Sequence, residues 1–346
     1  MTAHQRLDSH SSVQDRYGTC DVCGDTGRQR PHEALERVFY SGEVFRYYEC
    51  DVCGSAALAD VPHDLGRYYP DDYYSFSPAE GGDPQSVLTR MLRHVVVRAA
   101  LLNPATARAT SALSARAGAP IEPWVRLLAG LHLNRRTPIL DVGCGSGHRL
   151  RTLRRFGFDN LTGIDAHLPV PPTGTGSDGD LRLLKGAITE LTDLFDVIMF
   201  HHSLEHMAEP AHVLRAANEI LSPGGVVIVR VPLAQSFAWR VYGTEWVQWD
   251  APRHHFLFSP NGLRLLASRC DLAVRKIVYD SNDFQFWGSE LHRRRIPVRQ
   301  GGPDAGPPAS LFPQEELARY QRRARELNAK SDGDQAAFLL ARASDD

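Results

Sequence analysis

The chain has 346 residues, which is enough for one full α/β domain and a smaller attachment. Hydrophobic residues make up 42% of it and charged residues 23%, the proportions of an ordinary globular protein. The formal net charge of −2 argues against a strongly basic surface as the dominant feature, so nucleic acid is not an expected partner.

The amino-terminal segment, residues 1–19, is polar and lacks the apolar core of a signal peptide. No stretch approaches 18 uninterrupted apolar residues, so we expect no membrane span. These two features favour a cytoplasmic location. In that setting, paired cysteines indicate a metal site more often than a disulfide framework.

The first motif along the chain is a pair of Cys-x-x-Cys sequences, Cys20/Cys23 and Cys50/Cys53, each followed by glycine. Two such turns allow four thiolates to close tetrahedrally on one Zn²⁺. Four protein ligands leave no open coordination position, so we predict a structural zinc; the alternative is four unrelated free cysteines. The other two cysteines, at 144 and 270, are interpreted as small packing residues.

Residues 1–80 therefore form an expected zinc-binding module that ends in a tyrosine-rich segment, Tyr68–Tyr74. Two interpretations of these tyrosines stay open. They cover the cofactor or substrate, or they pack the module onto the next domain. Residues 81–132 are expected to form a helical linker or cap, because Pro84–Leu102 places apolar side chains at helical spacing.

From residue 133 onward the pattern alternates between strands and helices, which predicts a doubly wound, mostly parallel, seven-stranded α/β sheet. Helices are expected at Ala211–Leu221 and Asn261–Ala267, and a short crossover at Pro169–Asp180. The predicted strands are Pro138–Val142, Leu161–Asp165, Leu181–Leu184, Phe195–Phe200, Val226–Val231 and Ala273–Val278.

A lid-like insertion is expected at about 281–330 within this domain, which spans 133–346. It contains a helix at Phe284–His292, a Pro/Gly-rich loop and a charged helix at Gln314–Ala329. Phe286 and Trp287 are candidates to cover an acceptor pocket. The last segment, Gln335–Ala343, fits either a strand or a short helix.

The strongest motif is the strand Ile139–Val142 followed by Gly143, Gly145 and Gly147, with a helix beginning near His148. The spacing is G-x-G-x-G and not the G-x-G-x-x-G of dinucleotide sites. An acid, Asp165, ends the next strand. A carboxylate there can accept hydrogen bonds from a ribose diol.

Residues 137–280 resemble the class I S-adenosylmethionine-dependent methyltransferases. The matching sequences are the glycine loop, Asp165, residues 195–206 and Leu221–Gly225. The resemblance implies S-adenosylmethionine as cofactor. By this resemblance, the methionine part of the cofactor contacts Asp141 and the loop residues Gly143, Cys144, Gly145 and Gly147. Asp165 binds the ribose, and Ala187 and Ile188 flank the adenine. The segment that begins at His201 borders the sulfonium. The segment Lys185–Ala187 departs from the pattern, since many relatives carry an acid there for the adenine amino group.

A zinc-binding head before such a domain resembles bacterial enzymes that methylate sugars and other natural-product intermediates. The tyrosine-rich segment and the run Trp249–His255 fit that group. Within that resemblance, we expect no counterpart of the additional carboxy-terminal domain of the sugar C-methyltransferases. This narrower resemblance implies a small-molecule acceptor that is methylated on oxygen or carbon.

Methyl transfer to an alcohol or a carbon acid calls for a base, and histidine suits that role near neutral pH. The candidate bases are His206, after the fourth strand, and His254 and His255, after the fifth. For His206 the competing interpretation is that it braces its loop together with Glu205. Arg253 is expected to contact a substrate carboxylate or phosphate, or to pair with Asp250.

Two other functions remain as alternatives. One is an RNA methyltransferase whose zinc head grips nucleic acid. The other is a non-catalytic protein that binds S-adenosylmethionine or a protein partner through a retained fold. No pattern in the sequence indicates an oligomeric state.

Overall fold

A computed structural model describes residues 15–69, 97–98, 101, 122–168, 181–298, 306–308 and 310–345. Several expectations fall wholly or mostly outside these ranges, namely the helix at Pro84–Leu102, the tyrosines at 73 and 74, and the crossover at Pro169–Asp180. No helix within the described ranges is both long enough and apolar enough to cross a membrane.

The central sheet contains seven strands within the described part of the chain, in the order β11-β12-β9-β8-β5-β6-β7. The pairs between β7, β6, β5, β8 and β9 are parallel, whereas β12 runs antiparallel to both of its neighbours. The predicted mostly parallel, seven-stranded sheet is therefore confirmed. The strands are β5 (Ile139–Val142), β6 (Leu161–Asp165), β7 (Arg182–Lys185), β8 (Phe195–His201), β9 (Leu221–Pro232), β11 (Leu272–Tyr279) and β12 (Gln335–Arg342).

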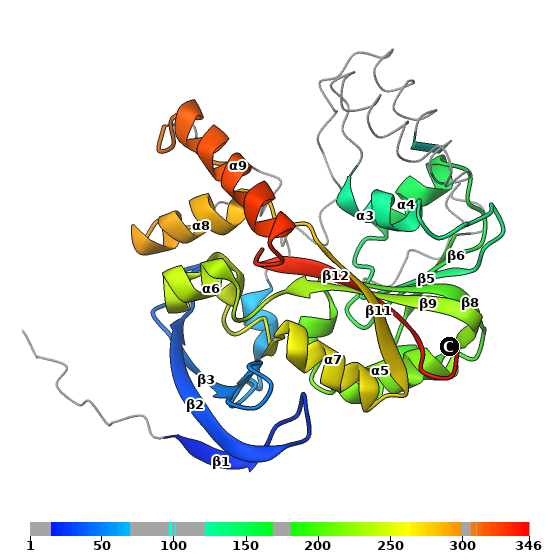
Figure 1. The fold of residues 1–346 in the computed structure, drawn as a ribbon, viewed down its shortest axis with the longest axis horizontal. Coiled ribbons are helices and arrows are strands. Elements are labelled where there is room, and N and C mark those ends of the chain that lie inside the picture. Colours follow the sequence, from blue (N-terminus) through cyan, green and yellow to red (C-terminus); the bar gives the residue numbers. More distant parts are fainter. Residues whose placement is uncertain are drawn as a thin grey trace, which may run out of the picture.

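Helices cover both faces of this sheet because successive strand side chains point to opposite faces. In β5, Ile139 belongs to a buried cluster with α3 (Pro123–Leu128) and α4 (His148–Arg155). Its neighbour Leu140 belongs to a second cluster with α5 (Pro210–Glu219) and α7 (Pro260–Ser268). Figure 1 shows the two helix layers on either side of the strands. The segment Gln335–Ala343, which fitted either a strand or a helix, forms β12 because it is buried between β9 and β11.

Local chemistry fixes where the helices begin. Ser259 caps α7, since its side chain accepts a hydrogen bond of 2.8 Å from the Gly262 N–H, and Pro260 occupies the first turn. Ser236 caps α6 (Phe237–Tyr242) in the same way by accepting from the Trp239 N–H at 3.2 Å. These caps let both helices start directly after an extended segment.

The amino-terminal region forms a second sheet with the strand order β1-β2-β3-β4-β10 among the described residues. Its last strand, β10 (Phe256–Leu257), belongs to the second half of the chain and pairs antiparallel with β4. The cysteine module and the larger domain thus share one sheet. The other strands are β1 (Arg16–Thr19), β2 (Thr26–Leu35), β3 (Val44–Cys50) and β4 (Ala56–Leu58).

A third buried cluster joins the amino-terminal sheet to α6, α8 (Phe284–Arg293) and α9 (Gln314–Ala329). Phe286 and Trp287, which were expected in a lid, are buried within this cluster. Tyr47 from β3 and Trp246, which follows α6, are also completely buried there. The insertion therefore packs against the cysteine module through a continuous apolar core.

Phe338 offers a test of how far the fold depends on β12. Its side chain is buried in the cluster on the α5/α7 face of the central sheet. We expect Phe338→Ala to lower the free energy of unfolding by about 3–5 kcal/mol, because the substitution leaves a cavity in the core. Urea unfolding followed by circular dichroism measures the change.

Leu194→Ala is the matched control because that side chain is 54% exposed. The control should change the free energy of unfolding by less than about 0.5 kcal/mol. Equal effects of the two substitutions would contradict the burial of β12.

Candidate active site

The glycine loop joins the carboxyl end of β5 to α4. Gly143 has a φ of +73°, and a Cβ atom placed on it would lie 2.5 Å from the Cβ of Ser203. The Ser203 hydroxyl donates a hydrogen bond of 2.7 Å to the carbonyl of Val142. Glycine is required at 143 because the loop that follows β8 is fastened onto the end of β5. This contact places residues 201–206 directly beside the glycine loop.

Asp165, at the carboxyl end of β6, closes the other side of the glycine loop. One of its carboxylate oxygens accepts from the Gly145 N–H at 2.9 Å, and the other accepts from the His167 N–H at 2.8 Å. A carboxylate has about four acceptor positions, so these two bonds leave room for two hydroxyl donors. The geometry fits a ribose diol.

Asp141 lies on β5, two residues before the loop, and is completely buried. Neither of its carboxylate oxygens has a hydrogen-bond partner. Burial raises the pKa of Asp141 to about 6, while the charge of Arg149 acts in the opposite direction. A buried carboxylate without a hydrogen-bond donor can accept one from a positive group, such as the α-ammonium of a bound amino acid.

Ala187 and Ile188 follow β7 at the same edge of the sheet. Ile188 is buried in the core, whereas the Ala187 N–H donates to Oε1 of Glu190 at 2.8 Å. Glu190 therefore brings a carboxylate beside Gly186, where the resemblance suggests an acid. Sequence reasoning missed this residue. The signal was an acid three residues after Ala187, the spacing at which a side chain reaches back to a turn's backbone.

Five histidines and one glutamate gather after β8 and β9, and we call this set the histidine cluster. It contains His201, His202, Glu205, His206, His254 and His255. Arg230 on β9 holds one end of the cluster by donating to the Nε2 atoms of His201 and His202. Its guanidinium also pairs with Asp280 at 2.7 Å. His202 in turn donates from Nδ1 to Oε1 of Glu205 at 3.2 Å.

The other end of the cluster is held by backbone carbonyls. Nδ1 of His206 lies 2.8 Å from the carbonyl oxygen of Arg253, and Nδ1 of His254 lies 2.8 Å from that of Gln248. The two rings pack edge to face with centroids 4.7 Å apart. His255 donates its backbone N–H to the carbonyl of Glu205 at 2.8 Å, while its ring nitrogens have no hydrogen-bond partner. The three candidate bases are therefore neighbours.

Burial sets the charge of this cluster. It lowers the pKa of His206 to about 3 and that of His255 to about 4, so both rings are neutral near pH 7. Burial also raises the pKa of Glu205 to about 8. A neutral imidazole has a lone pair that can accept a proton or bind a cation.

Arg253 pairs with protein carboxylates. It is completely buried, contacts Asp250 at 2.6 Å and lies 3.5 Å from Glu36. Its Nη1 also donates to the carbonyl of Tyr68 at 3.2 Å. Of the two expectations for Arg253, the structure shows the pairing with Asp250. The neighbouring Tyr69 hydroxyl lies 3.3 Å from Nδ1 of His206, so the tyrosine-rich segment reaches the histidine cluster.

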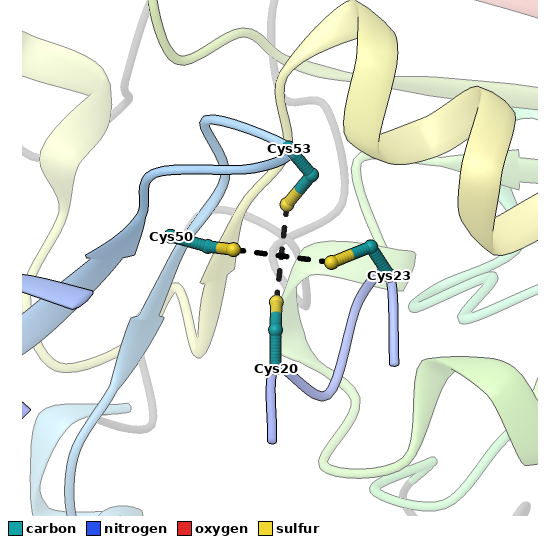
Figure 2. A group of neighbouring side chains, drawn as sticks. All are labelled: Cys20, Cys23, Cys50 and Cys53. Carbon is teal, nitrogen blue, oxygen red and sulfur yellow. Dashed lines mark hydrogen bonds between the residues drawn. The ribbon is translucent and has the colours of Figure 1, made fainter. Parts of the chain in front are cut away.

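The four cysteines meet between β1, β3 and the turns that follow these strands, and Figure 2 shows their sulfurs pointing toward a common centre. The Sγ atoms of Cys20 and Cys53 are 3.8 Å apart, as are those of Cys23 and Cys50. A regular tetrahedron with Zn–S bonds of about 2.3 Å has edges of about 3.8 Å. The cluster therefore has the size of a tetrathiolate zinc site.

Backbone bonds shape both cysteine turns in the same way. The Gly24 N–H donates to the carbonyl of Cys20 at 2.8 Å, and the Gly54 N–H donates to that of Cys50 at 2.7 Å. Gly54 has a φ of +73°, and a Cβ on it would collide with the side chain of Gln235. Burial raises the pKa of Cys23 to about 11, so a cation is needed to hold this sulfur as a thiolate.

Comparison with known proteins gives a consistent assignment. Residues 113–277 match a family described as a methyltransferase domain. A ubiquinone biosynthesis O-methyltransferase from Pseudomonas aeruginosa (strain UCBPP-PA14) is 31% identical over 171 residues, covering 45% of this chain and 71% of that protein. The chain belongs to the class I S-adenosylmethionine-dependent methyltransferases.

Two further similar proteins align with a smaller part of this chain. The ubiquinone biosynthesis O-methyltransferase of Cereibacter sphaeroides (strain ATCC 17029 / ATH 2.4.9) is 33% identical over 126 residues, which cover 33% of this chain and 50% of that protein. A crystal structure of an O-methyltransferase from neocarzinostatin biosynthesis is 25% identical, with 40% of this chain and 44% of that chain covered and a TM-score of 0.34.

The methyltransferase thus gathers the residues assigned to its cofactor at one edge of the central sheet. Asp141, Asp165 and Ala187 belong to or follow the adjacent strands β5, β6 and β7. The side chain of Cys144, in the glycine loop, is buried. Its sulfur packs so closely against Gly163 that a Cβ atom there would collide with it. Sequence reasoning missed the arginine and aspartate that order the histidine cluster. The signal was a charged residue, Arg230, within an otherwise apolar buried strand.

The unpartnered carboxylate of Asp141 leads us to expect that cofactor binding depends on pH. Below a pH of about 6 it takes up a proton in the free protein and loses its attraction for the cofactor's ammonium group. We expect the affinity for S-adenosylmethionine to fall by about ten- to a hundredfold as the pH drops through that value, because a hydrogen bond to a charged group is worth about 1.5–3 kcal/mol. Calorimetric titrations at several pH values measure this change.

Asp141→Asn is the control for this pH dependence. The variant should bind more weakly near neutral pH, and its affinity should vary little across the same pH range. An equally steep pH profile in Asp141→Asn would assign the effect to another group.

Proposed function

We propose that the enzyme transfers the methyl group of S-adenosylmethionine to a hydroxyl group of a small molecule, such as a sugar or another natural-product intermediate. The observation that carries this proposal is the contact of Ser203 with Val142 and Gly143, which sets the histidine cluster against the glycine loop. The O-methyltransferase relatives support oxygen as the methylated atom.

The cofactor supplies an electrophilic methyl group on its sulfonium. In the proposed complex, Asp165 binds the ribose hydroxyls and Asp141 faces the methionine ammonium group. Ala187 borders the adenine, with Glu190 beside it. His201 and the residues after it border the sulfonium. These contacts hold the methyl carbon toward the histidine cluster, where positioning alone provides effective molarities of about 10⁵–10⁸ M.

In the metal-free protein, His206 offers a neutral ring nitrogen to the proton of the acceptor hydroxyl. Its Nδ1 hydrogen is directed at the Arg253 carbonyl, so Nε2 carries the lone pair. Unlike His254 and His255, it is only half-buried. The acceptor oxygen bonds to the methyl carbon as the carbon–sulfur bond breaks, and the hydroxyl proton passes to Nε2 of His206. Solvent removes the proton before the next cycle.

The charge of the amino-terminal sheet supports a small acceptor over RNA. Arg28 pairs with Asp15 at 2.8 Å, and Arg30 pairs with Asp51 at 2.7 Å and with Glu49 at 3.0 Å. Arginines that are already paired with carboxylates present little free positive charge for phosphates. Salt-sensitive binding of RNA by the purified protein would favour the alternative instead.

We also propose that the cysteine cluster holds a structural zinc ion and that residues 1–80 act as a zinc-stabilised module. Most of residues 81–132, the predicted helical connection to the catalytic domain at 133–346, lies outside the described ranges. Four sulfurs at tetrahedral spacing support this assignment. The Cys53 carbonyl accepts from the Ser259 hydroxyl, so the zinc turn is bonded to the cap of α7.

Asp165→Ala provides the direct test of the proposed cofactor site. The wild type should bind S-adenosylmethionine and S-adenosylhomocysteine in calorimetric titrations and should not bind NADH. The variant loses two hydrogen bonds to a charged acceptor, so its affinity should fall at least about a hundredfold. Asp159→Ala is the matched control, since this aspartate precedes β6 at the opposite end of the strand, its side chain is 42% exposed, and it pairs with Arg135.

Binding of NADH, without binding of either sulfur nucleotide, would contradict the methyltransferase proposal. Binding of neither nucleotide by the folded protein would favour a non-catalytic role.

Cys53→Ser tests the zinc proposal. We expect this variant to lose one equivalent of thiolate-bound zinc and to unfold at a markedly lower temperature, because such sites are worth about 10–16 kcal/mol in small peptides. Cys270→Ala, at a buried cysteine outside the cluster, should keep the zinc. Metal analysis and thermal unfolding give both readouts. A full zinc content in Cys53→Ser would contradict the four-sulfur site.

A further inference from the structure

A second group of metal-ligating side chains lies inside the histidine cluster. One carboxylate oxygen of Glu205, one ring nitrogen of His206 and one of His254 all lie within 4.8 Å of one another. Within the described ranges, the cysteines form the only other such group of three or more. The three residues come from two segments, the loop after β8 and the segment before β10, so tertiary packing alone brings them together.

Hydrogen bonds to carbonyls determine where the two rings carry their hydrogens. A carbonyl oxygen can only accept, so Nδ1 of His206, 2.8 Å from the Arg253 oxygen, must be the donor. The same holds for Nδ1 of His254, 2.8 Å from the Gln248 oxygen. In the neutral rings, Nε2 of each residue therefore carries a lone pair. Histidines that bind metals are oriented by this kind of bond.

Glu205 is oriented by an equally specific chain of donors. Arg230 can only donate, so Nε2 of His202 accepts from it and the His202 hydrogen lies on Nδ1. That hydrogen is donated to Oε1 of Glu205 at 3.2 Å. The other carboxylate oxygen, Oε2, is buried and has no hydrogen-bond partner. Each of the three residues thus offers an atom with a lone pair, and Oε2 of Glu205 accepts no hydrogen bond.

The charges around the group are arranged to tolerate a cation. Arg230 is neutralised by Asp280 at 2.7 Å, and Arg253 is neutralised by Asp250 at 2.6 Å and lies 3.5 Å from Glu36. Asp250 also lies 3.7 Å from Nε2 of His254. Because Asp250 is bonded to Arg253, we treat it as a negative charge near the metal-ligating group and not as a metal ligand. The site therefore combines three neutral or anionic donors with paired arginines.

We propose that Glu205, His206 and His254 bind a divalent transition-metal cation such as Zn²⁺ at the acceptor side of the active site. Two imidazoles and one carboxylate are a ligand set typical of catalytic zinc and of non-haem iron sites. Three protein ligands leave a coordination position open, and His206 is only half-buried, which provides access to it.

This inference rests on the proposed methyl transfer and specifies the acceptor. The open position binds the acceptor through its hydroxyl oxygen, and the cation's charge lowers the pKa of that hydroxyl. The proton passes to water, the oxygen bonds to the methyl carbon, and the carbon–sulfur bond breaks. In the metal-loaded enzyme, His206 is then a ligand and not the base.

The amino-terminal module positions one of the proposed ligands. The Tyr47 hydroxyl, on β3, donates to the His254 carbonyl at 2.8 Å, and the Leu58 N–H, on β4, donates to the His255 carbonyl at 2.8 Å. His254 is therefore held by the sheet whose end carries the cysteine cluster. A structural metal and a catalytic metal would then act on the same segment.

Cobalt binding tests this proposal directly, because Co²⁺ bound to nitrogen and oxygen shows visible d–d bands without the thiolate charge-transfer bands of the cysteine site. Purified full-length protein is first analysed for metal content and then titrated with Co²⁺. We expect the wild type to reach two metal equivalents in total, one of them with the spectrum of a nitrogen–oxygen site.

Glu205→Gln and His254→Ala should each lose that second equivalent, whereas His212→Ala, at an exposed histidine on α5, should retain it. A wild type that takes up only the thiolate-bound equivalent overturns the proposal, whether or not any variant folds. Calorimetry with S-adenosylmethionine on the same samples separates the two hypotheses. Cofactor binding without a second metal refutes only the cation site, and a second metal without cofactor binding refutes the proposed function.

Discussion

The arrangement of the active site depends on the close approach of two loops at the carboxyl edge of the central sheet. Ser203 bonds to the Val142 carbonyl, and its side chain occupies the space that a Cβ on Gly143 would need. Because β5 and β8 are adjacent parallel strands, the loops that follow them leave the sheet side by side. One contact therefore joins the glycine loop to the start of the histidine cluster.

The amino-terminal sheet contributes to the active site although its cysteines lie outside it. Its fourth strand pairs with β10, which begins immediately after His255. Tyr47 and Leu58 hold the carbonyls of His254 and His255, and Tyr69 reaches His206. Loss of order in the cysteine turns would therefore release the segment that carries two of the three candidate bases. The amino-terminal module thus supports the segment that carries candidate bases, in addition to forming its own strands.

Polar order in the histidine cluster comes from residues that lie far apart in the sequence. Asp280 pairs with Arg230, Arg230 bonds to His202, and His202 bonds to Glu205. Each group is satisfied by the previous one, which is the condition under which a buried polar network is stable. The chain of donors ends at the unpartnered Oε2 of Glu205. A network with one unpartnered acceptor at its end is suited to bind a cation or a substrate hydroxyl.

The local sequence alone determined the glycine loop, the acid at Asp165, the cysteine turns and the alternating strands, because these features depend on residue type and short-range periodicity. It could not decide whether Gln335–Ala343 is a strand, since an apolar run fits both periods; burial between β9 and β11 decided it. Nor could it show that β10 completes the cysteine sheet, or that Glu205 and His254 face each other. Those contacts join residues dozens to hundreds of positions apart, and only packing in three dimensions specifies them.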